Sequence, residues 1–214
     1  MKKIGIMGGT FNPIHLGHIE IAKAAYEQYK LDEVWFMPNH IPGYKPGIGV
    51  VSGEHRLKMA SLAIDGYDHF AVSDFELLRE GKTYSYETFT KLKEIYPDCY
   101  FFFIMGADSL FYFDKWVKPE VILRHTDVLV ASRDNNGVGE IIEKIKEMDT
   151  NFGKGHFSVI KCNNVDCSSS RLREYIYKTA HPEGVNNMDY IKEYICRYLP
   201  GGVYEYIKEK ELYI

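Results

Sequence analysis

The chain has 214 residues, of which 45% are hydrophobic and 26% are charged, and this composition is typical of a globular protein. Its net charge of −4 argues against a nucleic-acid partner, because a surface that binds nucleic acid needs a basic stripe. No apolar run approaches membrane-spanning length, so we expect no membrane partner. The sequence opens directly into a predicted strand and its four cysteines lack C-x-x-C spacing, which favours reduced thiols and a cytoplasmic location.

Short apolar runs alternate with helical patterns along the whole chain. We predict strands at residues 4–7, 33–37, 70–73, 100–105, 128–131 and 157–160. Helices are expected from His15, from Ser52 or Gly53, from about Tyr86, and at about 170–178, 188–198 and 201–210. The alternation predicts an α/β fold with a doubly wound parallel sheet. We expect a single domain over 1–214, of which about 168–214 forms a C-terminal helical part.

Residues 4–18, IGIMGGTFNPIHLGH, have the pattern of a buried strand, a glycine loop and a helix start. Gly8 and Gly9 let backbone N–H groups approach an anion closely, and a helix N-terminus adds partial positive charge. His15 and His18 are three residues apart, which places both rings on one face of the first helical turn. Their imidazoles add hydrogen-bond donors that can become cationic near neutral pH. The stretch therefore predicts a phosphate site, although it is neither G-x-G-x-x-G nor a Walker loop.

The run GGTFNPIHLGH resembles the signature of the H-x-G-H nucleotidyltransferase superfamily, and it is most similar to that of bacterial nicotinate-nucleotide adenylyltransferases. The resemblance implies a Rossmann-like fold and transfer of the adenylyl group of ATP to nicotinate mononucleotide, with Mg²⁺ arriving with ATP. It implies that His18 contacts the α-phosphate and His15 the outer phosphates. Further ATP contacts that it implies are Gly8, Gly9, Thr10 and Phe11. Asn12 stands where that family usually has an aspartate, a change that removes a carboxylate from near the phosphates.

The segment 39–53 is rich in glycine and proline and is predicted to be a long loop. We assign its Lys45 to the nicotinate mononucleotide site as a phosphate contact, with a solvated loop lysine as the alternative. Glu54-His55-Arg56 matches a family E-x-R element, which we interpret as a helix start with Arg56 in a salt bridge.

Asp74-Phe75-Glu76 with Arg79, followed by Gly81 to Tyr86, resembles the family pattern D-x-E-x-x-R and G-x-S-Y-T. In that family the main chain and a hydroxyl hold the nicotinate carboxylate at a helix N-terminus, where successive N–H groups favour an anion. The resemblance implies acceptor contacts at Thr83, Tyr84 and Ser85. The alternative is an ordinary Ser/Thr helix cap.

Gly106, Asp108 and Trp116 resemble the family's G-x-D…W pattern. Gly106 permits close approach by ATP, and Asp108 at a strand end is suited to accept from ribose hydroxyls or to touch a metal. Trp116 is expected to stack on the positively charged pyridine ring, with a core tryptophan as the alternative. Arg133 follows the predicted strand at 128–131 and is assigned to the acceptor site as well.

The run Ser168-Ser169-Ser170-Arg171-Leu172-Arg173 resembles the superfamily motif S-S-T-x-[IL]-R at a predicted helix start. Hydroxyl and N–H groups of Ser168 and Ser169 are expected to bind ATP phosphates, and Arg173 adds a fork of charged donors as a third catalytic residue. The alternative is a helix N-cap followed by a surface arginine.

All these polar segments except 74–86 follow the ends of predicted strands, and ligands in doubly wound sheets bind beyond those ends. We therefore expect a single site, whose substrates are ATP and nicotinate mononucleotide. Alternatives are another acceptor (nicotinamide mononucleotide or phosphopantetheine), cytidylyl transfer, and a protein that binds ATP without turnover. The tyrosine-rich C-terminal helices fit either a homo-oligomer surface or core packing.

Overall fold

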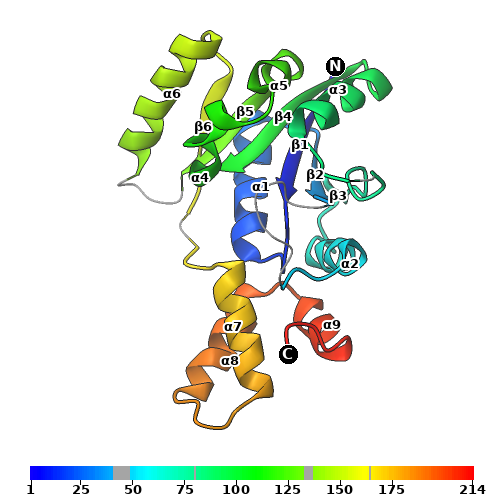
Figure 1. The fold of residues 1–214 in the computed structure, drawn as a ribbon, viewed down its shortest axis with the longest axis vertical. Coiled ribbons are helices and arrows are strands. Elements are labelled where there is room, and N and C mark those ends of the chain that lie inside the picture. Colours follow the sequence, from blue (N-terminus) through cyan, green and yellow to red (C-terminus); the bar gives the residue numbers. More distant parts are fainter. Residues whose placement is uncertain (41–48, 80, 133–136, 164) are drawn as a thin grey trace.

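The computed structural model describes residues 1–40, 49–79, 81–132, 137–163 and 165–214. Six strands form one sheet in which every pairing is parallel, in the order β3-β2-β1-β4-β5-β6 (Figure 1). The strands are β1 (Lys2–Gly9), β2 (Glu33–Pro38), β3 (Phe70–Val72), β4 (Cys99–Gly106), β5 (Thr126–Ser132) and β6 (Phe157–Lys161). The predicted α/β fold with a doubly wound parallel sheet is confirmed, and each predicted strand lies within one residue of an observed one or inside it.

Both faces of this sheet are buried, because side chains along its central strands alternate between two hydrophobic cores. In β4, Phe101, Phe103 and Met105 belong to one core and Ile104 to the other. The most apolar run of the sequence therefore became a central strand, as parallel strands covered on both sides require. Parallel pairing also brings the carboxyl ends of β1 and β2 to the same edge, where Gly9 lies opposite Pro38.

The helices cover the two faces of the sheet. They are α1 (Leu16–Tyr29), α2 (Gly53–Ala63), α3 (Ser85–Ile95), α4 (Ala107–Leu110), α5 (Pro119–His125), α6 (Val138–Phe152), α7 (Ser169–Ala180), α8 (Met188–Tyr198) and α9 (Val203–Glu209). Helix α2 begins as predicted after Ser52, whose Oγ accepts the N–H of His55 at 3.3 Å. Helices α4, α5 and α6 lie in the stretch between β4 and β6, for which the sequence carried no helix prediction. Over the described residues, no helix is both long and apolar enough to cross a membrane.

The last three helices continue one of the two cores beyond the sheet. Figure 1 shows α7 and α8 side by side, extending away from the sheet, with α9 close to α2. Their apolar side chains, among them Leu172, Ile195 and Val203, belong to the same core as Ile19 of α1 and Phe36 of β2. The predicted helices at 170–178, 188–198 and 201–210 are confirmed.

Candidate active site

The loop after β1 is shaped by close packing of Phe11 beneath the turn. The Phe11 side chain is 2% exposed, and its ring meets the His18 ring edge-on at 5.1 Å between centroids. A Cβ at Gly9 would come within 2.9 Å of the Phe11 ring, so this turn needs a glycine at position 9. Because its side chain is in the core, Phe11 has only its backbone to offer a nucleotide. Gly8 is exposed and Thr10 is half-buried beside it.

His15 and His18 lie against each other at the start of α1, with ring centroids 3.8 Å apart. His15 is the N-cap residue and its side chain is 4% exposed, whereas the ring of His18 is half-buried. The backbone N–H of His15 donates to His18 Nδ1 at 3.2 Å. An imidazole nitrogen that accepts a hydrogen bond carries no proton, so a neutral His18 carries its proton on Nε2. His18 can therefore donate to an anion without being cationic.

Arg56 of α2 ties this loop to the end of β2. Its side chain is 1% exposed, and it donates to the backbone oxygens of Val51 at 3.2 Å, Thr10 at 2.9 Å and His40 at 3.1 Å. A fourth bond reaches Asn39 Oδ1 at 3.4 Å. Among the residues that the structure describes, no carboxylate lies at ion-pair distance from Arg56, and backbone oxygens take the place that the expected salt bridge would have had. Burial lowers the pKa of Arg56, and carbonyl oxygens solvate its charge instead.

The start of α7 lies against the same loop from the other side. Ser169 Oγ donates to Pro13 O at 2.9 Å, and Arg173 Nη1 donates to Asn12 O at 2.7 Å. Arg173 Nη2 also donates to Ser170 Oγ at 3.3 Å. Ser168 is the N-cap, and its Oγ accepts the N–H of Arg171 at 3.2 Å, a bond that does not use the O–H by which this serine could donate to a phosphate. The structure thus brings Ser169 and Arg173 to the loop that precedes the two histidines.

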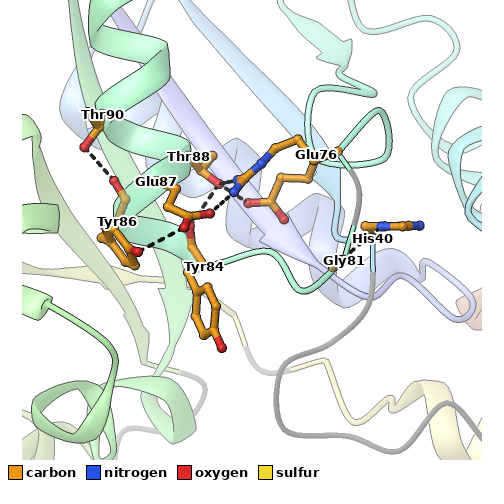
Figure 2. Close-up of polar contacts among 9 residues, drawn as sticks. His40, Glu76, Gly81, Tyr84, Tyr86, Glu87, Thr88 and Thr90 are labelled. Atoms are coloured by element: carbon orange, nitrogen blue, oxygen red, sulfur yellow. Dashed lines mark hydrogen bonds and ion pairs between the residues drawn. The ribbon is translucent and has the colours of Figure 1, made fainter.

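The predicted acceptor segment, Thr83 to Ser85, leads into the N-terminus of α3. Tyr84 is the N-cap residue and its side chain makes no capping bond, so the Ser/Thr cap alternative does not apply. The first N–H groups of a helix have no partner within the helix, which leaves donors for an anion. Figure 2 shows the Tyr84 ring pointing away from the polar cluster formed by Glu76, Glu87 and Thr88.

Hydrogen bonds link this polar cluster to the acceptor segment, Thr83 to Ser85. The Thr88 hydroxyl donates to Glu76 Oε1 at 2.6 Å, and Arg79 donates to Thr88 Oγ1 at 3.0 Å and to Glu87 (Figure 2). Thr88 Oγ1 also lies 3.3 Å from the backbone oxygen of Tyr84. Burial raises the pKa of Glu76, and its bond with Thr88 opposes this shift. On the far side, His40 Nδ1 donates to Gly81 O at 3.2 Å, which links the end of β2 to the acceptor segment.

The residues predicted after β4 divide between surface and core. Gly106 caps α4, and Asp108 is exposed in the first turn of that helix. Trp116 is half-buried, and its ring packs against Phe113 at 5.5 Å and Phe103 at 5.9 Å between centroids. One side of the Trp116 ring therefore packs in the core, as the alternative interpretation predicted. Lys45 and Arg133 lie outside the described residues.

Two residues of the site were not identified from the sequence. Tyr213 donates its hydroxyl to Asn12 Oδ1 at 2.7 Å, and Thr88 organises the cluster behind the acceptor segment. The pair Leu212-Tyr213 resembles part of a C-terminal pattern of the family, but that resemblance assigns Tyr213 no role. Thr88 could have been noticed, because it lies on α3 one turn after Tyr84.

Known proteins resemble this chain over most of its length. The family model described as cytidylyltransferase-like matches residues 6–175. A protein of Lachnoclostridium phytofermentans named a probable nicotinate-nucleotide adenylyltransferase is 43% identical over 82% of this chain and 88% of its own length. One of the same name from Shewanella pealeana is 36% identical over 99% of this chain and 95% of its own.

Among solved structures, the fold is similar to that of Plasmodium falciparum nicotinic acid mononucleotide adenylyltransferase complexed with NaAD. The TM-score is 0.76 and the identity 21%, over 100% of this chain and 98% of the other. The sequence relatives decide the family, and the structural neighbour supports the fold. This chain belongs to the cytidylyltransferase-like family and, within it, to the nicotinate-nucleotide adenylyltransferases.

Proposed function

We propose that this chain transfers the adenylyl group of ATP to nicotinate mononucleotide, giving nicotinate adenine dinucleotide and pyrophosphate in the biosynthesis of NAD. The observation that carries the proposal is the contact between the two elements that the sequence predicts to bind phosphate. Helix α7 bonds through Ser169 and Arg173 to the loop that leads into His15 and His18. A triphosphate that lies along this junction would meet donors from both sides.

The reaction needs little proton chemistry from the protein. The attacking group is a phosphate monoester with a second pKa of about 6, so it is already largely dianionic at neutral pH. The barrier lies in bringing two polyanions into line at the α-phosphorus, and positioning can supply roughly 7–11 kcal/mol of such a barrier. We assign to His18 Nε2–H the stabilisation of charge at the α-phosphate, and to His15, Ser168 and Arg173 the outer phosphates that leave.

The backbone on both sides of the histidines supplies the remaining contacts to ATP. We assign phosphate contacts to the N–H groups of Gly8, Gly9, Thr10 and Phe11, and the adenosine to Gly106 and Asp108. Mg²⁺ keeps most of its water and phosphate ligands when it enters with a nucleotide, so it needs few ligands from the protein. The exposed carboxylate of Asp108 suits such a contact, and the metal would neutralise charge on the leaving phosphates.

For the acceptor, we propose that backbone N–H groups at the start of α3 bind the nicotinate carboxylate, together with the hydroxyls of Thr83 and Ser85. Tyr84 and the free side of Trp116 would border the pyridine ring. An uncharged amide gains less from aligned N–H groups than a carboxylate does, which favours nicotinate over nicotinamide. Lys45, as a phosphate contact, and Arg133 remain predictions for the acceptor site.

We also propose that residues 1–214 act as one domain, because a single hydrophobic core joins α1, β2 and the helices after residue 168. Such a domain would position Arg173 against the histidine loop without a hinge. A cytoplasmic location stays a prediction, as does a homo-oligomer.

The test is pyrophosphate release by the purified protein with ATP and Mg²⁺, using nicotinate mononucleotide, nicotinamide mononucleotide and phosphopantetheine in parallel. We expect turnover with the nicotinate acceptor and a much lower kcat/KM with the other two. Preference for another acceptor would keep the phosphate site and overturn the pyridine pocket. ATP binding without turnover on any of them would overturn the enzymatic proposal.

A further inference from the structure

The side chain of Asn12 uses both ends of its amide within the protein. Its Oδ1 accepts the Tyr213 hydroxyl at 2.7 Å and the backbone N–H of Val51 at 3.2 Å, while its Nδ2 donates to Gly49 O at 2.9 Å. Asn12 is 5% exposed, so water cannot replace these partners readily. A flipped amide would direct Nδ2 at two donors and Oδ1 at a carbonyl oxygen, and the orientation of this amide is therefore determined.

The backbone of Asn12 is held as well, since its carbonyl oxygen accepts from Arg173. One residue thus joins four segments: the loop before the histidines, residues 49–51, helix α7 and the segment after α9. The preceding residue, Phe11, has φ of 49°, a conformation that non-glycine residues adopt at a cost. Such a conformation persists only where the surrounding structure enforces it, and these contacts supply that enforcement.

Tyr213 is suited to the role of a lasting donor. It follows α9 with φ of 66°, which turns the chain back towards the loop, and its side chain is half-buried. Burial raises the pKa of Tyr213, and the charges of Arg173 and Arg56 oppose that shift without cancelling it. The hydroxyl therefore keeps its proton in neutral and mildly alkaline solution.

We propose that Tyr213 is a positioning residue for the adenylyl transfer: by holding the Asn12 amide, it sets the histidine loop against residues 49–51 and Arg173. The effect on turnover rests on the proposed function. The effect on the loop does not, and it can be measured without substrate.

Tyr213→Phe removes the hydroxyl and keeps the ring. Asn12 Oδ1 retains the N–H of Val51, so no buried donor loses its partner and the fold should survive. Loss of one neutral hydrogen bond to the loop predicts a kcat lower by about three- to tenfold. Because the hydroxyl acts on the loop before ATP binds, exchange of the Val51 N–H with solvent should also become faster, by a similar factor.

Tyr29→Phe is the matched control. Tyr29 is also half-buried and donates its hydroxyl to a backbone oxygen, that of Val159, at 2.8 Å. It ends α1, whereas the histidines begin it. Both variants should lose similar thermal stability, but only Tyr213→Phe should lower kcat and expose the Val51 N–H. In an Asn12→Ala background, Tyr213→Phe should change kcat by less than about twofold, because the group through which it acts is gone.

Wild-type kcat in Tyr213→Phe, or Val51 exchange no faster than in the control, would overturn the proposal. An equal loss of kcat in Tyr29→Phe would overturn it too, because the effect would then be one of general stability. If the wild type released no pyrophosphate with any acceptor, the proposed function would fail. The exchange comparison would still decide whether Tyr213 holds the loop.

Discussion

Replacing Arg56 by lysine tests whether a buried guanidinium assembles the walls of the site. Its four hydrogen bonds reach three segments: the loop after β1, Asn39 and His40 after β2, and the segment before α2. A lysine keeps the positive charge and most of the aliphatic side chain. Its ammonium group, however, cannot donate in several directions within one plane as the guanidinium does. Burial that lowers the pKa of Arg56 would act more strongly on a lysine, whose ordinary pKa is about 10.4.

The magnitude follows from these bonds. Three of them measure 2.9 to 3.2 Å and the fourth, at 3.4 Å, is weak. A hydrogen bond to a charged group contributes about 1.5–3 kcal/mol, and a lysine would keep one of the three good ones. Losing the other two predicts a fall of about 3–6 kcal/mol in the free energy of unfolding. In a chain of this size that lowers Tm by about 10 °C.

The assay is urea and thermal unfolding of Arg56→Lys beside Arg171→Lys. Arg171 is partly exposed, and solvent screens its ion pair with Asp166 at 3.3 Å, so its replacement by lysine should change Tm little. Arg56→Lys should also raise the KM for ATP, because Thr10 and His40 lose their common anchor. If the two variants unfolded within a degree of each other, the four bonds would not carry the stability assigned to them, and the reasoning would be refuted.

Three further predictions concern single side chains. His18→Ala should lower kcat by about 10²–10³ in the pyrophosphate assay while leaving the fold intact, because its ring is only half-buried; a kcat close to wild type would remove it from the mechanism. Thr88→Val should raise the KM for nicotinate mononucleotide by about tenfold and leave that for ATP unchanged, because the support behind Tyr84 is lost; equal changes in both would argue for general loosening. Burial and the acceptor Asp127 raise the pKa of Tyr100 to about 12, so the stability its hydroxyl contributes is fully present below the unfolded-state pKa of 10.0 and is lost as pH rises through 12. The stability gap between wild type and Tyr100→Phe, followed by urea unfolding at several pH values, should therefore shrink between pH 10 and 12, and a gap that stayed constant would contradict this.

The strands and the position of the site were predictable because they depend on local pattern. The run at 100–105 is too apolar for a strand with one face in water, and it became β4 between two cores. The pair Gly8-Gly9 predicted the end of β1. The structure gives the reason, because a Cβ at Gly9 would clash with the Phe11 ring. The pairing of His15 and His18 followed from helical spacing alone. Each of these inferences involves residues close in sequence or a pattern of burial.

The partners of the polar side chains were not predictable, because they depend on distant segments. Arg56 suggested a salt bridge, yet it bonds to Thr10, 46 residues away. Asn12 suggested only the loss of a carboxylate near the phosphates, and nothing local indicated its bond to Tyr213, 201 residues away. Such contacts are set by which loops the sheet order brings together. A sequence motif identifies the residue type at a site but not the group that it touches.

The distant contacts also bear on how the site would work. Arg173 has five N–H donors, and its bonds to Asn12 O and Ser170 Oγ engage only two of them. The same guanidinium can therefore hold the histidine loop and bind a leaving phosphate with its remaining donors. Arg56, Ser169 and Tyr213 each donate a hydrogen bond to the loop before the histidines, and these bonds are present without substrate. Donors that are already in position need no reorganisation as charge develops on the phosphates, and this is the main source of rate for a reaction that needs no general base.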